Sequence, residues 1–327
     1  MGFRVLGIGS PLVDYSMEVD DSFLDVHVPG GKGASRPLPS KKKEALLHGA
    51  DRFLCTPGGS AANSIRIFAS LGGEAAFLGT NGVDREGRIF RESLRRSGVD
   101  DTLLQDDGSR PSGCCITLVT PDAERTMLFN LADSPKLTER DIDGIDFGQF
   151  DCVLLEGYLL HEEWWDALLR RASGAGCRIA MDLNNFELVA ANREVFRKYV
   201  ERYVDILFAN EQEAAALFPG EEMDALIAGI SACAATSVVK LGENGSLIAT
   251  EGKVVQVPAR REIQVRDTTG AGDYYAGGFL LGMARGGSPE QCGRIGTLCA
   301  AEIIQTPGTV LEDPVVEHLK QSIAEVV

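Results

Sequence analysis

Residues 267–273 read Asp267-Thr268-Thr269-Gly270-Ala271-Gly272-Asp273, and an apolar helical pattern follows directly, Tyr274-Tyr275-Ala276-Gly277-Gly278-Phe279-Leu280. The small residues Gly270, Ala271 and Gly272 leave backbone N–H groups uncovered at a helix start, where four donors lack partners and the helix dipole is positive. Such a turn can hold a phosphate or a developing oxyanion. Because Asp273 would repel a phosphate, we interpret it as the base that takes a proton from an attacking hydroxyl. The alternative is a structural turn in which Asp273 only complements the helix dipole.

This heptad and the helix after it resemble the C-terminal signature of the ribokinase/PfkB family of carbohydrate and nucleoside kinases. In that family the acid at the position of Asp273 is the catalytic base, and the small residues before it form the anion hole. The resemblance therefore implies catalytic roles for Asp273 and for Gly270, Ala271 and Gly272.

Two segments in the N-terminal part of the chain resemble the same family. The sequence Pro57-Gly58-Gly59-Ser60-Ala61-Ala62-Asn63 precedes an apolar helical pattern and is similar to the family's G-G-x-x-x-N signature, in which the Asn contacts the substrate. Asp14 follows the first predicted strand, where the family has an Asp that binds substrate hydroxyls. The resemblance thus assigns Asp14, Gly58, Gly59 and Asn63 to the substrate. Without it, the glycines indicate a capped helix start and Asp14 a solvent-facing residue.

Strand and helix patterns alternate from residue 150 onward. Strands are predicted at 151–156, 177–183 and 204–209, with helices at 161–173, 187–201 and 211–218, and this βαβα order predicts a parallel sheet with helices on both faces. A hairpin at 113–120 and 125–129, with the strand at Asp14, supplies a small second sheet. The resemblance implies one doubly wound, mainly parallel, ribokinase-like α/β domain over 1–327, with lid segments at about 11–38 and 103–130.

The predicted nucleotide side depends on two further motifs. Asn210 and Glu213 match the family's N-x-x-E, which is associated with magnesium and phosphate, although the same pair also reads as a helix capping box. The turn from Gly242 to Gly245 follows a strand ending at Lys240 and is similar to the family's ATP-side loop. Together with the main signature, the resemblance assigns to ATP and Mg²⁺ the residues Asn210, Glu213, Lys240, Gly242, Gly245 and Thr268.

Two charged features complete the expected site. Arg125 lies where family members carry a phosphate-neutralising arginine, and an exposed strand arginine is the equal alternative. The family also places potassium beside the anion hole. Here Asp267, Thr269 and the loop 305–309 would supply its oxygen ligands, which suit a hard cation.

Composition excludes several other classes of protein. The 327 residues carry a net charge of −16, which argues against a nucleic-acid or anionic-membrane surface. The eight cysteines show no C-x-x-C pair and no zinc spacing, so we expect free buried thiols in a reducing compartment. No signal peptide and no apolar run of roughly 18 residues is evident. We therefore expect a cytoplasmic protein.

Two glycine-rich segments are similar to nucleotide-binding motifs but lack residues that those motifs require. Residues 7–12 read Gly7-Ile8-Gly9-Ser10-Pro11-Leu12 and lack the third glycine of a dinucleotide fingerprint. Residues 29–35 read Pro29-Gly30-Gly31-Lys32-Gly33-Ala34-Ser35, with glycine in place of the Ser/Thr of a P-loop and no strand before it. We expect a flexible loop at 29–35.

The resemblance covers the whole chain and implies transfer of the γ-phosphoryl group of MgATP to a primary hydroxyl, with K⁺ as a further cofactor. The segments 120–126 and 207–211 look most like bacterial adenosine-kinase-like members, while free sugars such as ribose or fructose stay open as acceptors. The expected partner is this small molecule, and the lid offers a surface for a homodimer. The alternative from another class is a catalytically idle relative that binds a sugar or nucleotide as a sensor or scaffold.

Overall fold

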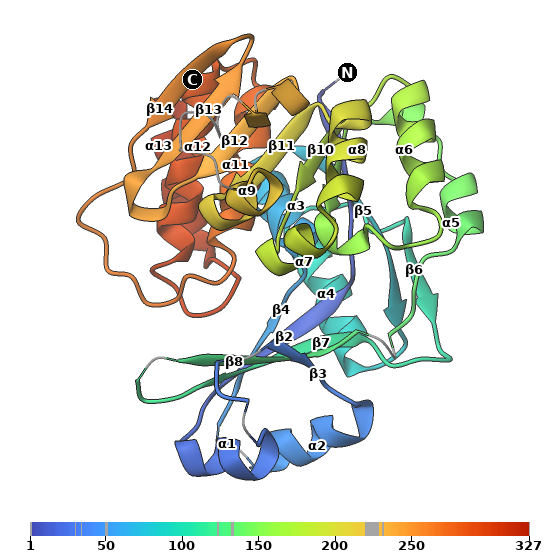
Figure 1. Cartoon of the computed structure of the whole chain (residues 1–327), viewed down its shortest axis with the longest axis vertical. Coiled ribbons are helices and arrows are strands. Elements are labelled where there is room, and N and C mark those ends of the chain that lie inside the picture. The colour runs from blue at the N-terminus through green and yellow to red at the C-terminus, as the bar shows by residue number, and fades with distance from the viewer. Residues whose placement is uncertain are drawn as a thin grey trace.

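The computed structural model describes residues 2–29, 31–33, 35–49, 52–122, 124–131, 134–219, 229–230 and 232–326. Its strands form a large and a small sheet (Figure 1). Along the large sheet the order is β14 (Lys253–Val257), β13 (Ser246–Thr250), β12 (Thr236–Lys240), β11 (Ile206–Asn210), β10 (Arg178–Asp182), β9 (Cys152–Glu156), β1 (Arg4–Ile8), β5 (Glu74–Gly82) and β6 (Leu104–Asp107). All pairs from β12 to β6 are parallel, and β13 and β14 add an antiparallel edge.

Helices cover both faces of the large sheet, as the βαβα pattern predicts. One face carries α3 (Ser60–Ser70), α4 (Arg85–Arg96), α11 (Ala271–Ala284), α12 (Pro289–Ile303) and α13 (Asp313–Ala324). The other carries α5 (Glu139–Asp143), α6 (Trp165–Gly174), α7 (Phe186–Ala191), α8 (Arg193–Tyr203) and α9 (Glu211–Leu217). Because strand side chains alternate between faces, Ala180 packs in the core with Phe279, whereas Ile179 and Met181 pack in the core with Trp165.

The close contact between α3 and α11 positions the site described below. At Gly277 a Cβ atom would lie 2.3 Å from the backbone oxygen of Ser64, so only glycine allows this approach. The two helix starts, which carry Asn63 and Asp273, are thereby brought together.

The small sheet has the strand order β3 (Ser35–Pro37), β8 (Arg125–Asn130), β7 (Gly113–Val119), β2 (Leu12–Glu18) and β4 (Leu54–Pro57). Its outer face is covered by α1 (Asp21–His27) and α2 (Ser40–Gly49) (Figure 1). In β2, Val13, Tyr15 and Met17 are buried in the core beneath these helices. Asp14 lies on the opposite face, toward the large sheet. Because α1 and α2 cover the outer face of the small sheet, a homodimer through this sheet would have to use its other surfaces. The homodimer stays a prediction.

The structure differs from the sequence-based expectations in several places. Residues Leu104–Asp107 of the expected lid segment 103–130 form β6 and pair with β5 in the large sheet. The small sheet also takes a strand from outside both expected segments, β4, which pairs with β2. The single helix expected at 187–201 is two helices that meet at Asn192, the C-cap of α7 and the N-cap of α8.

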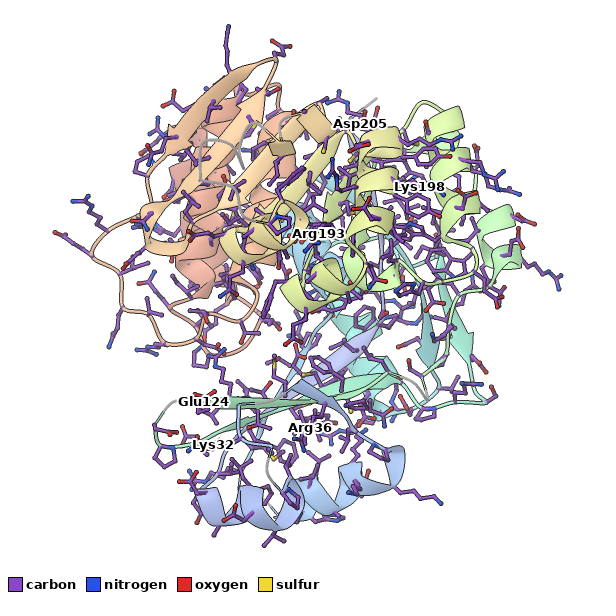
Figure 2. The ribbon with its side chains drawn as sticks, viewed as in Figure 1. Lys32, Arg36, Glu124, Arg193, Lys198 and Asp205 are labelled. Atoms are coloured by element: carbon purple, nitrogen blue, oxygen red, sulfur yellow. The ribbon has the colours of Figure 1, made fainter. Side chains whose placement is uncertain are left out.

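The segment that imitates a P-loop lies beside the small sheet. Figure 2 shows Lys32 there, at the end of the small sheet where Glu124 is labelled. The Lys32 ammonium group pairs with the carboxylates of Asp21 and Asp122 at 2.7 and 2.8 Å. It therefore joins the loop to α1 and to the β7–β8 turn, which agrees with the rejection of the P-loop. Gly30 and Ala34 lie outside the described residues.

All eight cysteines are free thiols, and seven of them are buried, as their spacing predicts. In the part of the chain that the structure describes, no helix combines the length and apolar character that a bilayer crossing requires.

Candidate active site

The start of α11 presents unpaired backbone donors. Gly270 is the N-cap and has φ +77°, a left-handed conformation that side-chain-bearing residues avoid. The Ala271 N–H donates to the Thr268 carbonyl at 3.3 Å. Among the described residues, the N–H groups of Gly270, Gly272 and Asp273 have no acceptor. Three donors thus lie at the positive end of the helix, as an anion-binding turn requires.

The Asp273 carboxylate is held by two donors from the start of α3. The Ser60 hydroxyl donates to Asp273 Oδ1 and the Asn63 amide donates to Asp273 Oδ2, both at 2.7 Å. Asn184, which follows β10, donates in turn to Ser60 Oγ at 2.6 Å. Burial raises the pKa of Asp273 to about 6, although these hydrogen bonds lower it. A carboxylate with a pKa near the working pH is suited to act as a general base.

A cavity of about 500 Å³, the intersheet cavity, lies between the small sheet and the ends of α3 and α11. Its polar end contains Asp14, Gly59, Asn63 and Asp273. The small sheet and the facing loops add an apolar wall of Leu12, Val119, Met127, Phe129, Leu131, Tyr158 and Leu188. Further polar residues complete the lining, among them Ser10, Ser16, Thr56, Thr117, Arg125, Glu156, Asn185 and Asp267. This cavity can take a ligand with a polar end and a flat or apolar body.

A second cavity of about 680 Å³, the α12 cavity, lies on the other side of the same turn. It is lined by the predicted nucleotide residues Lys240, Gly242, Gly245 and Thr268, by Ala271 and Gly272, and by an apolar wall of Ile263, Val265, Ala300, Ala301 and Ile304. Residues 267–273 therefore separate the two cavities. Asp273 lines the intersheet cavity, Ala271 and Gly272 line the α12 cavity, and Gly270 lines neither of the two.

Lys240 supplies a buried positive charge at this turn. Its ammonium group pairs with Asp182 Oδ2 at 2.6 Å and lies 3.0 Å from where a Cβ atom of residue 272 would be. Burial lowers its pKa, but the carboxylates of Asp182 and Glu213 outweigh burial, so that the pKa of Lys240 is raised. The lysine therefore stays protonated beside the unpaired N–H groups.

Asn210 and Glu213 line neither cavity. They form the capping box of α9, in which the Asn210 side chain accepts from the Glu213 N–H and both Glu213 oxygens accept from Asn210 at 2.8 and 2.9 Å. Burial and the neighbouring Asp182 raise the pKa of Glu213 to about 7. The capping role that the sequence indicated is present, and the role toward magnesium stays a prediction.

Arg125 reaches the turn from the small sheet. Its guanidinium donates to Asp267 Oδ1 at 2.8 Å and to Thr269 Oγ1 at 3.2 Å. Asp267 Oδ1 also accepts from the Thr269 backbone and hydroxyl, and Asp267 Oδ2 accepts from the Gly308 N–H at 3.2 Å. The predicted cation ligands therefore do meet, but Arg125 already lies against the carboxylate.

Asp14 lies on β2 beside Gly58, where a Cβ atom would come within 2.3 Å of Asp14 Oδ2. Burial raises the pKa of Asp14 to about 7, and the nearby charge of Arg66 opposes the rise. A carboxylate in this position, at the polar end of the intersheet cavity, can accept hydrogen bonds from ligand hydroxyls.

Five residues of the site were not predicted: Ser60, Arg66, Glu156, Asp182 and Asn184. Glu156 ends β9, lines the intersheet cavity and accepts from the backbone N–H groups of Ser10 and Ala61 at 2.7 and 3.2 Å. Burial raises its pKa to about 7. For one of them, Arg66, the sequence carried a signal that could have predicted it. Arg66 is a charged residue within an apolar helix, and it lies three residues after Asn63, on the same helical face.

Comparisons with known proteins identify the family and the fold. The family model described as "pfkB family carbohydrate kinase" matches residues 37–315. A probable sugar kinase from Rhizobium etli CFN 42 is 32% identical, with a TM-score of 0.89 and full coverage of both chains. The adenosine kinase of Sinorhizobium meliloti is 34% identical with a TM-score of 0.87, covering 98% of this chain and 100% of that one.

Adenosine kinase 2 of Arabidopsis thaliana is 26% identical and covers 93% of this chain and 94% of its own. The match to the family model covers most of the chain, and the solved structures share its two-sheet architecture, so the expected ribokinase-like fold is confirmed. The protein therefore belongs to the pfkB family of carbohydrate kinases, phosphotransferases that act on the hydroxyl groups of sugars and nucleosides.

Proposed function

We propose that this protein transfers the γ-phosphoryl group of MgATP to the primary hydroxyl of a ribonucleoside. The observation that supports this most directly is the meeting of two cavities at residues 267–273. A carboxylate lies on one side of this turn, while Lys240, Ala271 and Gly272 lie on the other. An acceptor hydroxyl and a terminal phosphate would meet there.

In this proposal Asp273 accepts the proton of the acceptor hydroxyl as its oxygen attacks the γ-phosphorus. The N–H groups of Gly270, Gly272 and Asp273, together with Lys240, stabilise the charge on the transferring phosphoryl group. Ser60 and Asn63 keep the carboxylate in place until the acceptor hydroxyl arrives. The ADP formed stays on the side of the α12 cavity, and the phosphorylated acceptor leaves through the intersheet cavity.

The apolar wall of the intersheet cavity favours a nucleoside over a free sugar. Asp14 and Asn63 supply partners for ribose hydroxyls at one end. Met127, Phe129 and Leu188 would contact a base, whereas a free pentose or hexose has no apolar body to bury against them. Two of the similar proteins above bear the name adenosine kinase. A free sugar is the second candidate, because another of them bears the name sugar kinase.

A substrate panel tests this function. Purified protein is supplied with ATP, Mg²⁺ and K⁺ and with adenosine, other ribonucleosides, ribose or fructose, and ADP release is measured. We expect the highest kcat/KM for a purine ribonucleoside. Preference for ribose or fructose would transfer the assignment to sugars. A negative panel from folded protein would support the idle sensor or scaffold.

The residues around the α12 cavity fit a magnesium ion that binds together with ATP rather than one held by protein ligands alone. Among the described residues, no group of three or more histidine, cysteine, aspartate or glutamate side chains could hold a metal ion. Mg²⁺ in nucleotide sites binds mainly to phosphates and water, with one or two carboxylates. Asp182 and Glu213 are the nearby carboxylates that would orient such waters. The ion supplies charge neutralisation on the phosphates when bound.

A monovalent cation at Asp267 and Thr269 is a further part of the proposal. The loop 305–309 contacts Asp267 through Gly308, as expected, and carbonyl oxygens there suit K⁺. We expect turnover to be severalfold faster in KCl than in choline chloride at equal ionic strength. Equal rates in the two salts would indicate that Arg125 alone balances the Asp267 carboxylate.

Asp14→Ala tests the recognition of acceptor hydroxyls. Removing a charged hydrogen-bond partner costs about 1.5–3 kcal/mol, so we expect KM for the acceptor to rise roughly 10- to 100-fold. KM for ATP should change little, because Asp14 lines only the intersheet cavity. Steady-state kinetics with each substrate varied in turn measure both values, and an effect confined to the ATP KM would contradict the assignment.

A further inference from the structure

Arg66 of α3 is a buried guanidinium that the proposed chemistry does not use. Only 3% of the residue is exposed. Its Nη1 donates to Ser93 Oγ at 3.0 Å, and its Nη2 donates to the Pro57 carbonyl at 2.9 Å and to Asn63 Oδ1. All three acceptors are neutral, although a buried charge without compensation is costly. Its compensation must therefore come from carboxylates at longer range.

Those carboxylates belong to the site. The acidic groups that favour the charged form of Arg66 are Tyr274, whose pKa of about 12 leaves the phenol neutral, and the carboxylates of Asp14 and Asp273. Asp14 in turn faces Arg66 on α3, Asp273 on α11 and Asp267 before α11. Asp267 is paired with Arg125 at 2.8 Å and Lys240 acts on Asp273, whereas the cation that acts on Asp14 is Arg66. Arg66 therefore offsets the repulsion that Asp14 meets from the two other carboxylates.

Arg66 also determines the orientation of the Asn63 amide. Because Asn63 Oδ1 accepts from Arg66, Asn63 Nδ2 is left to donate to Asp273 Oδ2 at 2.7 Å. A reversed amide would direct its carbonyl oxygen at the carboxylate of Asp273, and two acceptors cannot form a hydrogen bond.

We propose that Arg66 is a positioning residue that keeps the Asn63 amide directed at the catalytic carboxylate and favours the form of Asp14 that accepts hydrogen bonds from the acceptor hydroxyls. This inference rests on the proposed function. It assigns to one buried arginine a role toward both Asp14 and Asn63, the two residues proposed to bind the acceptor. The arginine itself does not line the intersheet cavity.

The test compares Arg66→Met and Arg66→Lys with Arg96→Met. Arg96 is an exposed arginine on the wall of the cavity of about 170 Å³ that opens onto Arg66, so its variant controls for loss of a nearby charge. We expect Arg66→Met to raise KM for the acceptor about tenfold, in line with the loss of a charged hydrogen bond. Its acidic limb of kcat/KM should move to higher pH, because Asp14 loses the cation that favours ionisation. Arg66→Lys should recover part of both effects, and Arg96→Met should match the wild type.

The small cavity permits chemical rescue. Arg66→Ala leaves a space that is continuous with the cavity of about 170 Å³, and millimolar guanidinium chloride can refill it. We expect guanidinium, but not sodium chloride, to lower the acceptor KM of Arg66→Ala. No rescue, together with an unshifted pH profile in Arg66→Met, would overturn the proposal.

A readout without catalysis separates this inference from the proposed function. Burial raises the pKa of Asp14 to about 7 in the folded protein, so folding binds a proton and stability falls as pH rises from the unfolded value toward about 7. Without Arg66 the pKa of Asp14 in the folded protein is higher, so the loss of stability with rising pH continues above pH 7. The Tm deficit of Arg66→Met should therefore widen as pH rises past about 7.

A deficit that is constant with pH, with an unchanged acceptor KM, would mean that Arg66 only ties α3 to α4 and β4 through Ser93 and Pro57. Absence of wild-type turnover would instead contradict the proposed function, and the pH dependence of Tm would still decide the role of Arg66. If Arg66→Met does not yield folded protein, the same measurements on Arg66→Lys decide.

Discussion

Asp273→Asn is expected to lower kcat by roughly 10²–10⁴, the usual contribution of a positioned general base. The asparagine keeps the size of the side chain, and its amide oxygen can still accept from Asn63, while its NH2 group donates to the Ser60 hydroxyl, which rotates to accept. The fold and nucleotide binding should therefore persist. The asparagine cannot accept the proton of the acceptor hydroxyl. Single-turnover measurements with saturating ATP and acceptor isolate this step from product release.

Ser60→Ala is the matched control for this substitution. It removes one hydrogen bond to the Asp273 carboxylate but leaves the carboxylate, so the loss in kcat should be much smaller. The wild-type kcat should fall as pH falls through about 6, the pKa to which burial raises Asp273, because the protonated acid cannot act as a base. A near-normal kcat in Asp273→Asn would reduce Asp273 to a helix-capping residue.

The residues that local sequence patterns identified are those whose role depends on their own segment. Gly270 needs a left-handed backbone and Asp273 needs a helix start, and both requirements are met within seven residues. Asn63 is set by the helix that follows Gly59. Because α3 and α11 pack closely, two such segments about 200 residues apart meet in space.

Features that depend on tertiary contacts were missed. Residues Leu104–Asp107 are mostly polar and resemble a turn, and they form a strand only because the edge of β5 is available for pairing. Arg66 is buried because Ser93 and Pro57, from other elements, accept its hydrogen bonds. Asn184 has φ +62° and reaches Ser60 from the end of β10, a contact that no spacing within either segment indicates.

Arg125→Ala is expected to lower kcat by about 10²-fold, the lower range for removing one donor from a charge-stabilising site. The guanidinium lies against Asp267 and Thr269 at the turn that carries the anion hole, so its charge acts where negative charge develops during transfer. KM for either substrate should change less than kcat, because this interaction is strongest in the transition state. Arg125→Lys should keep part of the rate, because an ammonium group supplies the charge but not the planar set of donors of a guanidinium group.

Stability separates this role from a structural one. The side chain of Arg125 is 37% exposed, and an exposed ion pair contributes only about 0–1 kcal/mol, so Arg125→Ala should unfold near the wild-type Tm. Arg110→Ala, which removes an exposed arginine elsewhere in the chain, controls for net charge and should leave kcat unchanged. If Arg125→Ala also keeps the wild-type kcat, Arg125 is a strand arginine that only pairs with Asp267. The small sheet then supplies no charge to the transfer step, and its role as a lid would rest on the exclusion of water alone.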